Sequence, residues 1–149
     1  NLEGVIPDDI QPGDITHAKV RREGKDISII TYGAGVYKAL EAAAELAQSG
    51  IDAEVVDLRV LRPLDEKTIL DSVSKTHRAL IVEEAWQSVS ISSEVSARIT
   101  EHCFYELDAP VKRLCGIEVP IPYPKHLEDA SLPQKEQIIS ETKKLLQHG

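Results

Sequence analysis

The chain has 149 residues, of which 42% are hydrophobic and only 4% aromatic, and its formal net charge is −8. This size and composition predict one domain with a core packed mainly by aliphatic side chains. The acidic charge argues against general nucleic-acid binding, which needs basic surfaces to replace counterions, and no apolar run approaches the length of a membrane span.

Residues 1–16 contain two glycines and two prolines, which predicts an extended arm or linker. The arm either leads from a preceding domain or is a frayed terminus, and residues 17–149 form the domain itself. The chain begins at Asn1 and contains no Met, so we expect a piece of a longer polypeptide. Residues 18–23 are charged and alternate weakly, which suits an edge strand. Local spacing alone predicts a hairpin between them and residues 27–31.

Residues 26–50 form the stretch around which the rest of the chain is organised. Ile27, Ile29 and Ile30 indicate a buried strand, and apolar residues at helical spacing follow from residue 36 to Gly50. Residues 51–58 are a second buried strand. Two strands joined by such a helix form a parallel βαβ unit.

The rest of the chain continues the alternation of helices and strands. Asp65 is a candidate N-cap. The predicted elements are a helix at 66–74, a strand at 78–83, a connection at 84–91, a helix from Ser92 or Ser93 to 107, a strand at 111–115, a long ordered loop at 117–133 and a helix at 135–146. This order predicts a doubly wound α/β/α layer, whose ligands normally bind outside the carboxyl ends of the strands.

Candidate chemical groups are few. Gly33-Ala34-Gly35 lacks the third glycine of a dinucleotide fingerprint, so a tight turn explains it better. Glu83 and Glu84 close a strand, but neighbouring strand residues point to opposite faces. One of them is therefore expected to make a structural ion pair, with Arg59 or Arg62 as the suggested partner, rather than an acid–base dyad.

The remaining side chains offer no recognisable catalytic or metal site. The five histidines have no metal-ligand spacing, and the serines form no nucleophile elbow. Cys103 and Cys115 fit no CxxC pattern and are predicted to be reduced, mostly buried thiols. Trp86, in the loop after a strand, is either an interface anchor or a plug over the core. The sequence thus predicts no catalytic, cofactor-binding or metal-binding residue.

A series of motifs in fixed order resembles a known family. The chain is similar to the C-terminal transketolase-like domain, and most closely to that domain in the β subunit of the decarboxylating component of pyruvate dehydrogenase. The resemblance covers nearly the whole chain. The motifs are T-Y-G (31–33), D-L-R-x-L-R-P-L-D (57–65), K-T-H-R (75–78), V-E-E-A-W (82–86), S-E-V-x-A-R-I (93–99), L-D-A-P-V-K-R (107–113), P-I-P-Y (120–123) and L-E-x-A-x-L-P (127–133).

The resemblance implies a three-layer fold with a five-stranded sheet, mostly parallel, in which residues 18–23 form an antiparallel edge strand beside residues 53–58. We prefer this arrangement to the hairpin. It also implies a parent enzyme that binds thiamine diphosphate and Mg²⁺ outside this domain, decarboxylates a 2-oxo acid and acylates a lipoyl group. One departure is S-I-S-S-E (90–94), where relatives often have G-x-G-A-E.

The implied role of this domain is assembly and docking. Its partners would be the α subunit, a second β subunit and the peripheral subunit-binding domain of the dihydrolipoyl acyltransferase. Asp108 and the C-terminal Gly149 would receive that basic module, and Trp86, Glu83 and Glu84 are interface candidates. The compartment would be the cytoplasm in bacteria and the mitochondrial matrix or plastid stroma in eukaryotes.

Three alternatives remain open from the sequence. The parent could be a branched-chain 2-oxo acid dehydrogenase, although P-L-D (63–65) and P-I-P-Y-P (120–124) favour pyruvate. The chain could instead be a stand-alone regulatory domain that binds a nucleotide or small molecule at its strand ends. It could also be a fragment of transketolase or of deoxyxylulose-phosphate synthase.

Overall fold

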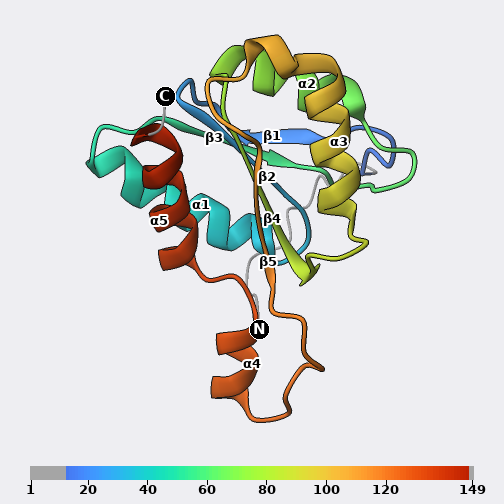
Figure 1. Cartoon of the computed structure of the whole chain (residues 1–149), viewed down its shortest axis with the longest axis vertical. Helices are drawn as coiled ribbons and strands as arrows, with labels where there is room; N and C mark the ends of the chain where they lie inside the picture. Colours follow the sequence, from blue (N-terminus) through green and yellow to red (C-terminus); the bar gives the residue numbers. More distant parts are fainter. Residues whose placement is uncertain (1–12, 148–149) are drawn as a thin grey trace, which may run out of the picture.

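The computed structural model describes residues 13–147, which form one five-stranded sheet with helices on both faces (Figure 1). The strands are β1 (Lys19–Arg22), β2 (Ile27–Thr31), β3 (Ala53–Asp57), β4 (Ala79–Trp86) and β5 (Lys112–Gly116). Their spatial order is β1-β3-β2-β4-β5. β1 pairs antiparallel with β3, and all other pairs are parallel, which confirms the predicted fold class.

The hairpin predicted from local spacing is wrong, and the arrangement implied by the resemblance is confirmed. β1 lies beside β3, with Lys19 opposite Asp57, while β2 lies between β3 and β4. Arg21 donates two hydrogen bonds, of 2.9 and 2.8 Å, to the buried Asp57 carboxylate, which helps to hold this edge strand in register. β1 is therefore an edge strand of the sheet, and it runs antiparallel to its neighbour β3.

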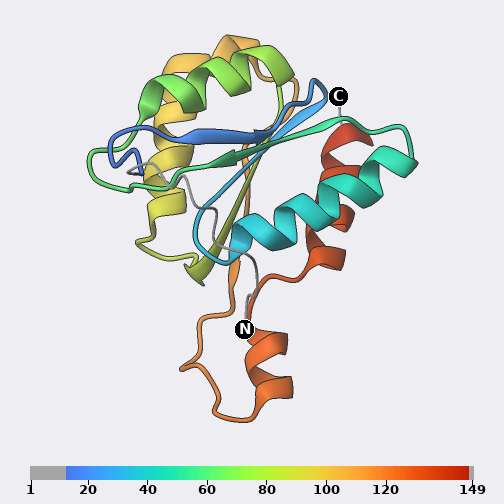
Figure 2. The same ribbon diagram turned by 180° about the vertical axis from the view of Figure 1, so that it is seen from behind.

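Two helices cover each face of the sheet, and the views from front and back agree on this (Figures 1 and 2). α1 (Gly35–Gln48) and α5 (Lys135–Gln147) pack on one face, while α2 (Glu66–Thr76) and α3 (Ile91–Cys103) pack on the other. In β2, Ile27 and Ile29 join the α1/α5 core and Ile30 joins the α2/α3 core. Because helices cover both faces and every β2 residue is buried, apolar side chains occur on both sides of this strand.

Several element ends differ from the predictions. Asp65 caps α2 as predicted, because its Oδ1 accepts from the Thr68 amide at 3.2 Å. The helix predicted to run to residue 107 ends at Cys103, and a 3₁₀ turn, η1 (Phe104–Glu106), follows. β4 continues to Trp86 rather than ending at Glu83. The long loop predicted at 117–133 contains a short helix, α4 (Lys125–Ser131).

Other predictions concern the termini and the thiols. Both cysteines are free, as predicted, with Cys103 buried and Cys115 partly buried. Most of the predicted arm, residues 1–12, and the C-terminal Gly149 lie outside the described residues. Within residues 13–147, no helix combines the length and the apolar character that a membrane crossing needs.

Candidate functional site

The carboxyl ends of β2, β4 and β5 bring together several polar side chains. Glu83 lies near the end of β4 and is only 3% exposed. The Tyr32 hydroxyl donates to its Oε1 at 2.6 Å, and the Ser92 backbone amide donates to its Oε2 at 2.9 Å. Ser92 Oγ also lies 2.6 Å from Ser90 Oγ and 3.3 Å from Cys115 Sγ. Glu83 thus fixes the first turn of α3 to the sheet.

The environment of Glu83 favours its charged form. Burial alone would raise the pKa of this carboxyl, but the hydrogen bonds from Tyr32 and Ser92 outweigh it and lower the pKa below its usual value. Burial, reinforced by the Glu83 charge, raises the pKa of Tyr32. Burial likewise raises the pKa of Cys115, so its thiol stays protonated and is a poor nucleophile at neutral pH. The cluster therefore works as a structural anchor.

One of the two acids makes an ion pair, as predicted, and it is Glu84. The suggested partners Arg59 and Arg62 are wrong, because the cation is Lys38. Tyr32 and Ser92 satisfy the Glu83 carboxylate instead. Glu84 faces the other side of the sheet and lies 3.6 Å from Lys38 Nζ, so the predicted divergence of the two acids is confirmed. Sequence analysis missed the roles of Tyr32 and Ser92. The available signal was a buried strand ending in Glu, followed by serines at a helix start.

The Gly33-Ala34-Gly35 turn has a packing explanation. Gly33 has a φ of +59°, which favours glycine. A Cβ on Gly35 would lie 2.3 Å from Thr31 Oγ1. Backbone conformation at Gly33 and steric crowding at Gly35 therefore explain why both positions are glycine, without a bound ligand.

The donor groups of the described residues do not fit a magnesium-bound diphosphate cofactor. Across residues 13–147, no three His, Cys, Asp or Glu side chains are placed to hold a metal ion together. Mg²⁺ bound to a diphosphate needs convergent oxygen ligands.

Asp108 lies at the opposite end of β5 from Glu83, at the surface. Its carboxylate is about half exposed, and its Oδ2 lies 3.0 Å from Arg78 Nη1. It borders a groove of about 530 Å³ whose apolar walls include Phe104, Leu107 and Pro110. An exposed acid therefore stands beside an open apolar surface.

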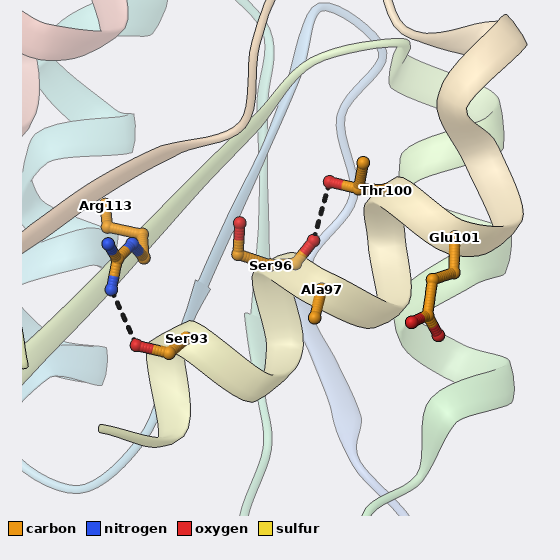
Figure 3. Close-up of a pocket in the computed structure, with 6 residues that line it drawn as sticks. All are labelled: Ser93, Ser96, Ala97, Thr100, Glu101 and Arg113. Atoms are coloured by element: carbon orange, nitrogen blue, oxygen red, sulfur yellow. Dashed lines mark hydrogen bonds between the residues drawn. The ribbon is translucent and has the colours of Figure 1, made fainter. Parts of the chain in front are cut away.

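A second hollow, of about 520 Å³, continues this groove along α3, because Ser96 and Thr100 line both (Figure 3). At its far end Arg113 Nη1 donates to Ser93 Oγ at 2.7 Å. The Thr100 hydroxyl donates to the Ser96 carbonyl at 2.8 Å. The side chains that α3 presents to this hollow are therefore mostly small, and the hydroxyls of Ser93 and Thr100 already have hydrogen-bond partners. The continuous groove runs between α3 and the edge strand β5.

Trp86 is 48% exposed and belongs to neither core cluster of the sheet. Its Nε1 donates to the Val119 carbonyl at 3.2 Å. Ser88, in the same loop, donates to Glu118 Oε1 from its amide at 3.0 Å and from its hydroxyl at 2.6 Å. These bonds join the loop after β4 to the segment after β5, with Trp86 on the outer surface.

The sequence model described as "Transketolase, C-terminal domain" matches residues 16–138. The chain belongs to this family. A structural neighbour described as "Split gene transketolase, inactive beta4 tetramer" superposes with a TM-score of 0.82 at 28% identity, covering 98% of this chain and 47% of that one. Fold and family therefore agree with the resemblance found in the sequence.

Curated relatives carry the comparison further. The chain is 45% identical over 91% of its length to the mitochondrial β subunit of the pyruvate dehydrogenase E1 component of Dictyostelium discoideum. It is 48% identical over 85% of its length to the 2-oxoisovalerate dehydrogenase β subunit of Bacillus subtilis. It is 41% identical over 99% of its length to the β subunit of acetoin:2,6-dichlorophenolindophenol oxidoreductase of Cupriavidus necator. The chain spans 38%, 39% and 44% of these relatives, respectively.

Proposed function

We propose that this chain is the assembly and docking domain of the β subunit of a thiamine-diphosphate-dependent 2-oxo acid dehydrogenase, and that it is not catalytic alone. The support is similarity along almost the whole chain to E1-type β subunits. Overall identity to the pyruvate, branched-chain and acetoin relatives is comparable, so identity alone does not indicate which substrate the parent enzyme uses. We assign pyruvate to the parent enzyme from P-L-D (63–65) and P-I-P-Y-P (120–124).

In the parent, thiamine diphosphate would supply the carbanion chemistry once bound, and this domain would position subunits around it. We propose the α subunit and a second β subunit as its assembly partners. The structural neighbour named as a β4 tetramer supports contact between β-type chains. The compartment would be mitochondrial or plastidic in a eukaryote and cytoplasmic in a bacterium, in line with relatives named as mitochondrial.

The observation that carries the docking role is the half-exposed carboxylate of Asp108 beside an apolar groove. A small basic module, such as the peripheral subunit-binding domain of a dihydrolipoyl acyltransferase, could pair with the acid and bury apolar side chains against Phe104 and Leu107. Arg78 fixes the carboxylate in place but leaves it reachable from solvent. The net charge of −8 would attract such a partner from a distance. The resemblance also implies that the C-terminal Gly149, which lies outside the described residues, receives the module.

Calorimetry between this chain and the subunit-binding module tests the proposal. We expect binding that weakens as salt rises, because surface charge pairs are screened. Asp108→Asn should weaken it at least about tenfold, the effect of losing one charge-assisted contact. Asp71→Asn is the matched control, since Asp71 is also an exposed acid paired with a cation, Lys67. An affinity that changes neither with salt concentration nor with Asp108→Asn would refute the docking role.

A second measurement addresses catalysis. The chain mixed with thiamine diphosphate, Mg²⁺ and pyruvate should release no carbon dioxide, whereas the assembled parent enzyme should. Decarboxylation by the chain alone would contradict the assignment of a non-catalytic role.

A further inference from the structure

Arg113 lies in β5 at one end of the hollow along α3 and is partly buried (Figure 3). Its Nη1 donates to the Gln87 carbonyl at 2.9 Å and to Ser93 Oγ at 2.7 Å. Within residues 13–147 no carboxylate pairs with this guanidinium, although the chain has 25 acidic and only 17 basic residues. The adjacent Lys112, by contrast, lies 3.4 Å from Glu141 Oε2. The positive charge of Arg113 is therefore available to an anion that enters the hollow.

The two hydrogen bonds of Arg113 hold its side chain without using the edge that binds anions best. Both bonds leave from Nη1, so the edge formed by Nε and Nη2 has no acceptor among the described residues. That edge carries two parallel N–H groups, which match the two oxygens of a carboxylate. Because the side chain is already held, little of its conformational freedom is lost on binding. A carboxylate therefore fits this end of the hollow.

The hollow opens onto an apolar surface, because Ser96 and Thr100 line both the hollow and the groove beside it. The two spaces measure about 520 and 530 Å³, and each has the size usual for a small-molecule site. A ligand whose carboxylate lies at Arg113 can cover this apolar surface with its remaining atoms. The apolar side chains of the groove are Phe104, Leu107, Ala109, Pro110 and Val111.

Two acids limit the charge that the ligand can carry. Glu101 lines the hollow at the end away from Arg113 (Figure 3), and Asp108 lines the apolar groove. A second negative charge at the far end of the ligand would lie near one of these carboxylates, and like charges repel. A phosphate monoester carries about two negative charges at neutral pH and meets only one cation here. The groove therefore favours an anion with a single charge.

We propose that the groove between α3 and β5 binds a small monocarboxylic acid with an apolar body, whose carboxylate pairs with the Nε–Nη2 edge of Arg113 and whose body lies against Phe104 and Leu107. This site goes beyond the proposed docking function, which depends on Asp108. The bound acid and the docking module would both cover Phe104 and Leu107, so each would exclude the other.

Titration of the ¹⁵N-labelled chain with octanoate, followed by NMR chemical shifts, tests the proposal. We expect saturable shifts in the amides of residues 93–101 and in the Arg113 Nε–H signal. The dissociation constant should be about 1 mM, a usual value for a ligand of about ten heavy atoms. Octanamide lacks the charge and octanedioate adds a second one, so each should bind at least about tenfold more weakly. These comparisons use the unaltered chain and do not depend on the folding of any variant.

Variants locate the site. Arg113→Gln should weaken octanoate binding at least about tenfold, because it removes the paired charge. Lys112→Gln is the matched control, since it removes an equal charge from the adjacent residue of β5, outside both spaces. Glu101→Gln should narrow the difference in affinity between octanoate and octanedioate. The amide spectrum of each variant shows whether it is folded.

Three results would overturn the proposal: shifts that do not saturate, equal affinity for octanoate and octanamide, or equal weakening by Arg113→Gln and Lys112→Gln. The titration contains no partner module, so it is separate from the test of docking. A chain that binds octanoate but not the basic module would refute docking and leave this site standing, and the reverse result would do the opposite.

Discussion

Replacing Glu83 with Gln tests whether a buried charge anchors α3 to the sheet. Both carboxylate oxygens accept hydrogen bonds, from Tyr32 and from the Ser92 amide. A hydrogen bond to a charged group contributes about 1.5–3 kcal/mol, and a neutral one about 1 kcal/mol. The amide oxygen of Gln can keep the Ser92 bond, while its NH₂ group faces a Tyr32 hydroxyl that can turn to accept. We therefore expect the free energy of unfolding at pH 7 to fall by about 2 kcal/mol.

The pH dependence gives the sharper measurement. The pKa of Glu83 is lowered in the folded state, so its charge stabilises the fold above the usual carboxyl pKa of 4.5. That contribution is lost as the pH falls through the lowered pKa. Gln does not titrate, so urea denaturation of both proteins between pH 7 and pH 3 should show their stability difference shrinking with acid.

A stability difference between the two proteins that stayed constant from pH 7 down to pH 3 would refute the reasoning, because the charge of Glu83 would then contribute nothing to stability. Tyr32→Phe supplies the second half of a double-mutant cycle. The two substitutions share one hydrogen bond, so their combined effect should be smaller than the sum of the two. Strict additivity would mean that Tyr32 and Glu83 do not support each other.

Two further predictions concern local geometry. Gly24→Ala should lower the free energy of unfolding by about 3 kcal/mol in a urea titration, because its Cβ would lie 2.3 Å from the backbone of β3. Gly50→Ala, at a φ of +79° with nothing within 4 Å, should cost only about 1 kcal/mol, and equal losses would contradict the steric explanation. Asp65→Ala should lose about 1–2 kcal/mol, because Asp65 caps α2 through Thr68 and also accepts from the Ala18 amide at 3.0 Å. In thermal unfolding, an Asp65→Asn variant that lost as much as Asp65→Ala would show that the cap is not the cause.

The fold was largely readable from the sequence where the pattern is local. In residues 26–50 the apolar residues predict a strand, the helical spacing predicts a helix, and Gly50 predicts where that helix ends. The structure has all three features. The partner of β1 was not readable in this way, because alternation identifies a strand but not its neighbour in the sheet. The resemblance supplied that information. α4 was missed because prolines dominate its surroundings and it presents no buried stripe.

The site was less predictable for a related reason. The sequence suggests a cation as the partner of one of the two acids, and it identifies Glu83 only as an acid at a strand end. The fold instead brings a phenol and a backbone amide to it, from residues 51 positions before and nine positions after it in the chain. Charge in a sequence is visible, whereas the hydroxyl and amide donors that satisfy a buried carboxylate depend on packing. The departure at residues 90–94 places serine hydroxyls within this network.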